Sequence, residues 1–248
     1  STNGATRVRI EGRVPELGAD TEGEGAGVRG ASEAATSRPA SMKLYVGTKN
    51  LSSWSMRAWL ALREADLPFE EEIIPLDTPS AATRLPQISP SSLVPVLQVD
   101  ETLTIWDTLA IAEWVTETTD VGWPRDTTRR AIARSACAEM HSGFVALRKQ
   151  MPMDLYGRHP TPPLEGALRR DVDRVLALWE TLRGRAADGP YLLGEWTHVD
   201  NFFAPVVTRF VTYGVELPSF AQAYSDLVLA RPSVQRWFAD AKADPWSL

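Results

Sequence analysis

Residues 43–62 read KLYVGTKNLSSWSMRAWLAL, and this stretch decides the fold around it. Residues 43–46 are short and apolar and predict a strand, whereas residues 53–65 have helical apolar spacing and predict a helix that ends near a proline. Ser52 and Ser53 stand where that helix begins, beside its unpaired N–H groups and the positive end of its dipole. The sequence therefore predicts a strand–loop–helix whose helix N-terminus favours negative charge.

Two interpretations of this serine pair stay open. Serine is one of the commonest N-cap residues, so capping alone explains one serine before an amphipathic helix. In the functional interpretation, a serine hydroxyl donates a hydrogen bond to an anion that the helix dipole also stabilises. A thiolate is such an anion. The rest of the sequence has to decide between the two.

The composition of the chain excludes several classes of protein. The chain has 248 residues, enough for one large or two modest domains, and a net charge of -6 that gives no reason to expect nucleic acid as a partner. No apolar run approaches the ~20 residues that span a membrane. Its one cysteine, Cys137, excludes an internal disulfide and a zinc site built from cysteines, and we expect no metal. A single cysteine also fits a cytoplasmic location.

The first 41 residues differ from the rest of the chain. They contain no aromatic residue and no sustained periodicity, and they are rich in Gly, Ala, Thr and Glu. Such a segment buries too little apolar surface to offset the entropy of ordering. Its acidic residues also disfavour a transit peptide. We expect residues 1–41 to be a disordered leader, or a segment added to a native chain that starts at Met42.

Residues 42–119 predict a small mixed sheet with helices on its faces. The expected order is strand, helix, strand, then strand, strand, helix, over residues 43–46, 53–65, 69–75, 94–99, 102–105 and 108–118. Asp100 and Glu101 predict a tight turn between the last two strands. Three prolines within residues 78–90 allow only a short, irregular helix there.

Beyond residue 126 the pattern is entirely helical. Five helices are predicted, over residues 127–150, 164–186, 197–213, 220–230 and 234–243. Only residues 206–211 compete as a strand, and that run is short. Thr197 and Asp200 form a capping box, so both are expected to be structural. His198 between them is expected at the surface, and Cys137 in the core. The fold class is therefore α/β followed by all-α.

Two further features of residues 42–119 are candidates for ligand binding. LVPVL at residues 93–97 places Pro95 at the start of an apolar strand. If the Val94–Pro95 bond is cis, the backbone of Val94 points outward and can pair with an extended peptide. Asp107 and Thr108 open the next helix, where they either cap it or receive the charged end of a small peptide.

Four motifs in order resemble those of the cytosolic glutathione S-transferases. SSWSMRAWLAL at 52–62 is similar to the zeta-type serine signature, LVPVL at 93–97 to the cis-proline motif, IWDTLAI at 105–111 to the Glu/Gln-Ser motif, and GEWTHVD at 194–200 to the family's folding signal. The resemblance covers residues 42–237. It implies a thioredoxin-like, glutathione-binding domain over residues 42–119 and an all-helical, substrate-binding domain over residues 127–248.

The resemblance also implies roles for particular residues. Ser52 is the first choice for the hydroxyl that activates the glutathione thiol, and Ser53 the second. The residues expected to bind glutathione are Leu93, Val94, Pro95, Asp107 and Thr108. Trp54 is expected on the side of the electrophilic substrate. His141 is a lone histidine on a long predicted helix, and two interpretations stay open for it: a structural or solvated side chain, or a substrate-binding residue that faces the cleft between the domains.

Three positions depart from the family pattern. Trp54 stands where zeta-type relatives have cysteine, which argues against their isomerase activity. Leu93 replaces the usual Lys or Gln before Val-Pro, which removes a contact to the glycyl carboxylate. Asp107 is one methylene shorter than the common Glu.

The expected function is that of a glutathione transferase, an enzyme of detoxification that attacks an electrophilic small molecule with the thiolate of glutathione. The alternatives are a glutathione-dependent peroxidase, dehalogenase or isomerase, or a binding protein of the same fold without turnover. The partners expected are glutathione as co-substrate and a second copy of the chain in a homodimer, with no nucleic acid and no membrane.

Overall fold

The computed structural model describes residues 41–245. The leader expected over residues 1–41 therefore lies outside the described residues, apart from Ser41. Within the described part, residues 42–119 carry all the strands and residues 127–243 carry helices only. None of these helices combines the length and the apolar character needed to cross a membrane.

Four strands form one mixed sheet in the order β2-β1-β3-β4. The strands are β1 (Met42–Gly47), β2 (Phe69–Ile74), β3 (Val96–Gln98) and β4 (Thr104–Trp106). β1 pairs with β2 in parallel and with β3 antiparallel, and β3 pairs antiparallel with β4 so that Val96 lies opposite Trp106. The turn after β3 is longer than the predicted two residues, because the Asp100 carboxylate accepts the N–H groups of Thr102 and Leu103.

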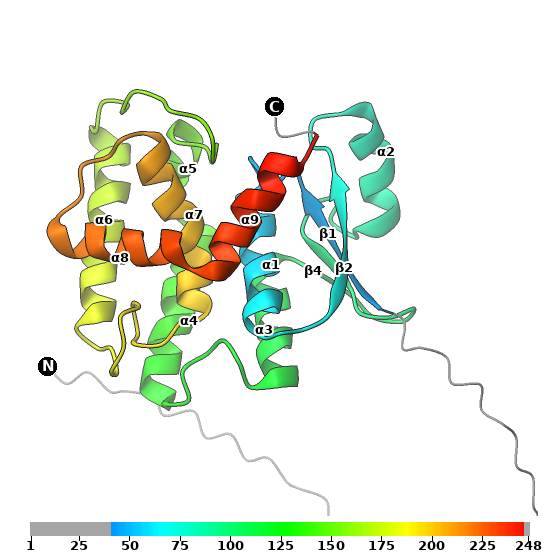
Figure 1. Ribbon diagram of the computed structural model, residues 1–248, viewed down its shortest axis with the longest axis horizontal. Helices are drawn as coiled ribbons and strands as arrows, with labels where there is room; N and C mark the ends of the chain where they lie inside the picture. Colours follow the sequence, from blue (N-terminus) through cyan, green and yellow to red (C-terminus); the bar gives the residue numbers. More distant parts are fainter. Residues whose placement is uncertain (1–40, 246–248) are drawn as a thin grey trace, which may run out of the picture. The chain divides into compact units, whose positions relative to one another are not determined.

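Three helices cover the two faces of this sheet. α1 (Ser53–Glu64) and α3 (Thr108–Thr119) pack on one face and α2 (Pro79–Ile88) on the other (Figure 1). α2 is a helix of 10 residues, longer than the short, irregular one predicted. Pro79 is tolerated because it stands in the first turn, where no helical N–H is needed, and Thr78 caps the helix with its side chain.

The alternation of side chains along β1 explains this layering. Leu44 and Val46 are fully buried in the large core that includes α1 and α3, while Tyr45 between them joins a smaller cluster with Ala81 of α2. Successive strand residues point to opposite faces, so both faces of the sheet are covered.

Six helices follow between residues 127 and 243, one more than the sequence predicts for this part of the chain. They are α4 (Thr127–Ser142), α5 (Val145–Gln150), α6 (Gly166–Arg183), α7 (His198–Thr212), α8 (Ser219–Ala230) and α9 (Pro232–Ala243). The helix expected over residues 127–150 is interrupted because Phe144 takes a left-handed conformation with φ of 53° directly after Gly143. The possible strand at residues 206–211 is part of α7.

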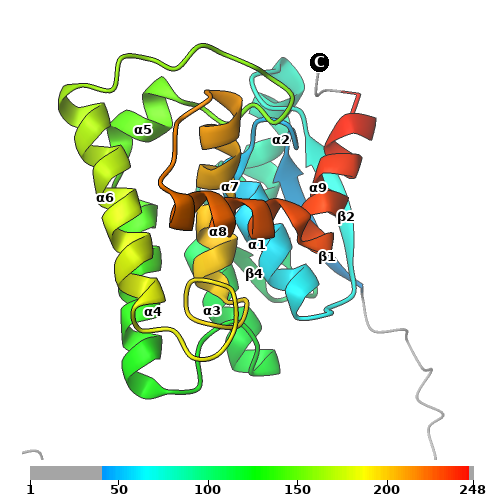
Figure 2. The same cartoon turned by 60° about the vertical axis from the view of Figure 1, so that its left-hand side comes forward.

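α7 lies at the centre of the helical part and packs directly against α1 (Figures 1 and 2). Fourteen of its residues are buried, including Phe202, Phe203 and Phe210. Trp179 of α6 contacts Phe203 and Phe210 edge-on. Because one core runs from the sheet through α1 to α7, the N-terminus of α1 is held against the helical part.

The capping box at the start of α7 is confirmed. Thr197 accepts from the backbone of α7, and the Asp200 side chain accepts from the N–H of Thr197 at 2.8 Å. The prediction that His198 lies at the surface is wrong, because its side chain is 1% exposed and packs edge-on against Trp123. Asn201 donates to His198 Nδ1 and the Thr116 hydroxyl is 2.9 Å from Nε2. This network fits a neutral imidazole with its proton on Nε2.

The buried His198 predicts a loss of stability in acid. Burial lowers its pKa to about 3 from an ordinary 6.5, so its contribution is present above pH 6.5 and is lost as the pH falls toward 3. Between pH 7 and pH 5 this loss is about 2 kcal/mol. We expect His198→Gln to remove most of that difference in urea unfolding at the two pH values.

The same change at the exposed His159 serves as a control and is expected to leave the pH dependence of unfolding in place. If the His198→Gln protein loses as much stability as the wild type between pH 7 and pH 5, His198 is not the group that responds.

Candidate functional site

A cavity of about 420 Å³ brings together the residues predicted to bind glutathione and the electrophile, but not Ser52 and Ser53. Its walls come from the N-terminus of α1, the loop before β3, the end of β4, the start of α3, and the helices α4 and α5. The lining residues are Trp54, Ser91, Leu93, Val94, Pro95, Trp106, Asp107, Thr108, His141 and Arg148. We call this cavity the cleft. Two other cavities, of about 380 and 580 Å³, are lined by none of the predicted site residues.

The Val94–Pro95 peptide bond is cis, as the sequence-based hypothesis required. Within residues 41–245 the backbone of Val94 makes no hydrogen bond, whereas the neighbouring Leu93 exchanges two with the hydroxyl of Ser89. Val94 therefore offers a free N–H and C=O on the wall of the cleft, the arrangement that an extended peptide can use as a strand edge. The side chain of Leu93 is 66% exposed and brings no charge.

Asp107 and His141 form a pair across the cleft. Asp107 caps α3 by accepting from the N–H of Leu109, and its two carboxylate oxygens lie 2.8 and 3.0 Å from His141 Nε2. The imidazole of His141 also packs against Trp54, with ring centroids 5.3 Å apart. His141 thus belongs to the cleft, as its substrate-binding interpretation requires, and it directly contacts one of the predicted binding residues.

Thr108 joins α3 to α1. Its side chain is buried, and its hydroxyl donates to the carbonyl of Trp54 at 2.9 Å. The hydroxyl is therefore already used, and what remains free at Thr108 is its N–H at the first position of α3.

The two serines lie beside the cleft and are not part of its wall. Ser52 and Ser53 are 7% and 8% exposed. Ser52 donates to Ser55 Oγ at 2.7 Å, and Ser53 Oγ accepts from Arg209 Nη2 at 3.2 Å. Ser52 is the N-cap residue of α1, yet its side chain makes no capping hydrogen bond. Capping therefore does not explain the side chain of either serine, and their hydroxyls are held by other polar groups.

Three arginines beside the cleft were missed by the sequence-based selection. Arg148 lines the cleft, with its guanidinium 5.5 Å from the Trp54 ring. Arg57 and Arg209 are buried behind it, in α1 and α7. The available signal was the position of each charge, because Arg57 and Arg209 occupy positions in apolar helical runs where a core residue is expected. Within residues 41–245 no group of three or more His, Cys, Asp or Glu side chains is placed to hold a metal ion.

Two family models match this chain in the order of its sequence. Residues 51–118 match the glutathione S-transferase N-terminal domain, and residues 165–240 match the glutathione S-transferase C-terminal domain. Together the two models match more than half of the chain.

Two curated proteins are similar to this chain in sequence. The chain is 23% identical over 211 residues to glutathione S-transferase L1 of Arabidopsis thaliana, covering 82% of this chain and 81% of that protein. It is 32% identical over 117 residues to a probable maleylacetoacetate isomerase of Caenorhabditis elegans, covering 46% of this chain and 53% of that protein.

Solved structures share the fold. A glutathione transferase homologue from Burkholderia gl BGR1, determined with bound glutathione, superposes with a TM-score of 0.64 at 26% identity and covers 82% of this chain and 99% of its own. A tau-class glutathione S-transferase from mango (Mangifera indica) superposes with a TM-score of 0.58 at 19% identity, covering 83% of this chain and 99% of its own. The two domain models, the mixed sheet with its helical part and the cis-proline at the cleft together show that this chain belongs to the glutathione S-transferase family.

Proposed function

We propose that this protein is a glutathione transferase whose cleft binds glutathione and activates its thiol. The observation that carries the proposal is the free backbone of Val94, which shares the cleft with the Asp107 carboxylate next to the N-terminus of α1. A tripeptide with a charged end and a central sulfur needs a strand edge, a carboxylate and a site for an anion. The glutathione bound to the Burkholderia homologue supports the same assignment.

Each residue predicted to bind glutathione then has a defined role in the cleft. The N–H and C=O of Val94 pair with the cysteinyl part of glutathione, and cis-Pro95 keeps them directed outward. Asp107 accepts the γ-glutamyl ammonium, and the free N–H of Thr108 donates to the adjacent carboxylate. Leu93 contributes apolar contact only, so the glycyl carboxylate receives no cation from that position.

Thiol activation is assigned to Ser52 or Ser53. Bound glutathione supplies a nucleophilic sulfur, whose free thiol has a pKa of about 8.5. A hydrogen bond to a charged group is worth about 1.5–3 kcal/mol, which lowers a pKa by roughly one to two units. One serine hydroxyl and the N-terminus of α1 are therefore sufficient to make the thiolate the main species at neutral pH.

The electrophile is assigned to the side of the cleft formed by Trp54 and His141. Trp54 offers an apolar face there, and His141 reaches the cleft from α4. In this proposal residues 42–119 form the glutathione-binding domain and residues 127–248 the substrate-binding domain. Because Trp54 stands where zeta-type relatives have a cysteine, the reaction assigned to the cleft is conjugation and not isomerisation.

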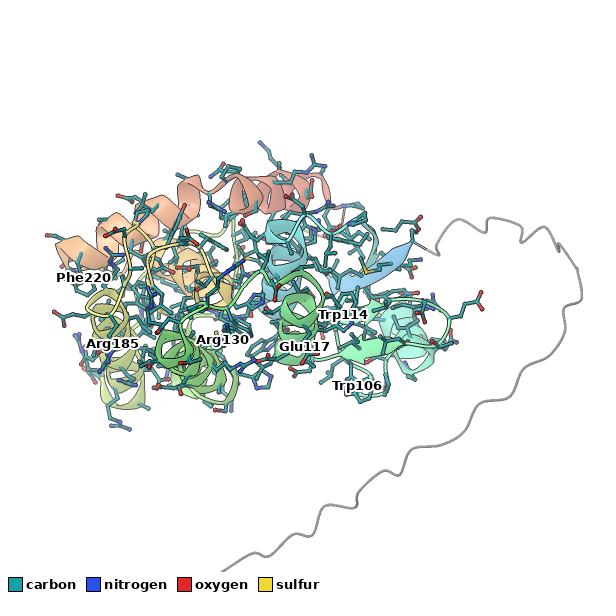
Figure 3. The ribbon with its side chains drawn as sticks, turned by 90° about the horizontal axis from the view of Figure 1, so that it is seen from below. Trp106, Trp114, Glu117, Arg130, Arg185 and Phe220 are labelled. Carbon is teal, nitrogen blue, oxygen red and sulfur yellow. The ribbon has the colours of Figure 1, made fainter. Side chains whose placement is uncertain are left out.

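A homodimer and a cytoplasmic location complete the proposal. Trp106 lies at the β4 edge of the sheet (Figure 3). Its side chain is 46% exposed, and with Ile105 and Leu109 it lines an apolar hollow on the surface. An apolar hollow beside the cleft suits contact with a second copy of the chain. The single cysteine, Cys137, is buried and fits a reducing compartment.

Calorimetric titration with glutathione, followed by an assay with chlorodinitrobenzene as electrophile, tests the proposed function. We expect saturable binding and thiol conjugation above the uncatalysed rate. Binding without conjugation of this or other electrophiles indicates a binding protein of the same fold. Absence of binding contradicts the proposal.

Asp107→Asn is expected to weaken glutathione binding by about 10- to 100-fold, since it removes a charged hydrogen-bond partner of the ammonium. kcat at saturating glutathione should change much less, because the ammonium is remote from the sulfur. Titration calorimetry and a KM determination measure the two effects. Glu101→Gln, which removes the same charge at an exposed turn, is the control. Equal weakening of glutathione binding by both variants would show that Asp107 does not bind the ammonium.

A further inference from the structure

Arg148 brings a cation to the wall of the cleft, and no carboxylate neutralises it. Its half-buried side chain donates one hydrogen bond, from Nη1 to the carbonyl of His141 at 3.3 Å. Within residues 41–245 no Asp or Glu forms an ion pair with Arg148, whereas Arg134, Arg174 and Arg231 each pair with a glutamate. Because a guanidinium carries five N–H donors, most of the donors of Arg148 are available to a ligand in the cleft.

The backbone that carries Arg148 is held in place from two sides. The carboxylate of Asp171 in α6 accepts the N–H of Leu147 at 3.0 Å, and the N–H of Arg148 donates to the carbonyl of Phe144 at 3.0 Å. The side chain of Leu147 is fully buried in the core. The guanidinium therefore reaches the cleft from a fixed helix, which is the arrangement that a binding residue needs.

The charges that line the cleft leave positive potential at the end where Arg148 stands. Asp107, His141 and Arg148 are the charged or titratable side chains of the lining. Both carboxylate oxygens of Asp107 are engaged by His141 Nε2, at 2.8 and 3.0 Å. Behind the wall, burial lowers the pKa of Arg57 and of Arg209, and the positive charge of Arg148 contributes to both shifts. Neither buried arginine lines the cleft, but both add to the field that an anion beside Arg148 meets.

The proposed binding mode of glutathione leaves Arg148 without a partner. The γ-glutamyl end of the tripeptide lies at Asp107 and Thr108, and its glycyl end lies toward Leu93. Arg148 comes from α5, and its guanidinium lies 5.5 Å from the centroid of the Trp54 ring, on the side of the cleft assigned to the electrophile. A guanidinium binds a planar carboxylate through two parallel hydrogen bonds, and an aromatic ring beside it packs against a second ring.

We propose that the preferred electrophile is an aromatic carboxylate, whose carboxylate is bound by Arg148 while its ring packs against Trp54. This inference rests on the proposed function, because the electrophile reacts with glutathione held in the same cleft. The sulfur of glutathione forms a bond to a ring carbon, a leaving group such as chloride departs with its bonding electron pair, and the thiol proton goes to solvent. The charge of Arg148 also offsets the repulsion between an anionic substrate and the thiolate.

The test compares two electrophiles that differ in charge alone at one position. Chlorodinitrobenzoate, with its carboxylate para to the chlorine, is the anionic substrate, and the corresponding chlorodinitrobenzamide is its neutral match. Each kcat/KM is divided by the uncatalysed rate constant of the same compound, so that the reactivity of the rings cancels. We expect the wild type to favour the benzoate by about tenfold or more, the worth of a charged hydrogen bond.

Arg148→Met is expected to lower kcat/KM for the benzoate by about 10- to 100-fold and to leave the amide within about threefold. Arg148→Lys keeps the charge but loses the planar fork, so we expect it to retain part of the preference. Glutathione affinity, measured by calorimetry, should stay within a few-fold in both variants. Lys149→Met removes an exposed cation from the next position of α5 and is expected to change neither substrate.

Three results overturn the inference. The first is a wild type that conjugates chlorodinitrobenzene but does not favour the benzoate over the amide. The second is a folded Arg148→Met protein that keeps the wild-type preference. The third is an Arg148→Met protein that loses both substrates equally and binds glutathione more weakly, because Arg148 then serves glutathione. If Arg148→Met does not fold, the wild-type preference and Arg148→Lys decide. A wild type that does not bind glutathione contradicts the proposed function itself.

Discussion

Replacing Ser52 and Ser53 together with alanine is expected to lower kcat for conjugation by about a hundredfold. The double variant removes both serine hydroxyls at the N-terminus of α1, beside the cleft, so the bound thiol is expected to return toward its ordinary pKa of about 8.5. A shift of one to two pH units corresponds to ten- to a hundredfold less thiolate at neutral pH. Initial rates at saturating glutathione and chlorodinitrobenzene measure this loss.

The matched control for this prediction is the double variant Ser135→Ala and Ser142→Ala. Both serines are exposed on α4, and their hydroxyls bond only to carbonyls one turn earlier in the same helix. We expect the control to keep the wild-type rate. A double variant at Ser52 and Ser53 that binds glutathione and still conjugates at the wild-type rate would show that neither hydroxyl activates the thiol.

Asp200→Ala is expected to destabilise the protein by about 3–5 kcal/mol. The buried carboxylate accepts four hydrogen bonds, from the N–H and hydroxyl of Thr197, the N–H of Leu192 and the hydroxyl of Tyr224. Its removal leaves those donors buried without an acceptor, which is costly. Urea unfolding followed by circular dichroism measures the change in the free energy of unfolding.

Two comparisons make the Asp200 prediction specific. Asp126→Ala removes an exposed N-cap carboxylate from α4 and is expected to cost only about 1 kcal/mol. Burial raises the pKa of Asp200 from an ordinary 3.8 to about 6. Protonation of this carboxyl therefore stabilises the folded state below pH 3.8, and that stabilisation is lost as the pH rises through 6. A loss below 1 kcal/mol in the Asp200→Ala protein would show that the four donors find other acceptors.

Much of the first part of the fold follows from local signals. The apolar spacing after Ser53 predicts α1 to within one residue, and the alternation along β1 agrees with a sheet covered on both faces. The interruption between α4 and α5 could not be predicted, because the apolar periodicity continues through Gly143 and Phe144 while the backbone turns. Periodicity reports which residues face the core and not whether the helix axis is continuous.

The candidate site was likewise predicted only in part from the sequence. Asp107 and Val94 were selected from motifs and His141 as a histidine on a long helix, and the three line one cleft. His198 was expected at the surface, because a capping box gives no information on what packs against it; Trp123 covers it. The contact between Ser53 and Arg209 joins residues 156 positions apart, and no local pattern predicts such a pairing. Long-range polar contacts of this kind are set by how α7 packs on α1.

Activation of the glutathione thiol is tested most directly by the ionisation of glutathione bound to the unmodified protein, followed by thiolate absorbance between pH 5 and pH 10. We expect a midpoint at about pH 6.5–7.5, one to two units below that of the free thiol. A midpoint at the value of free glutathione, measured at saturation, would contradict it.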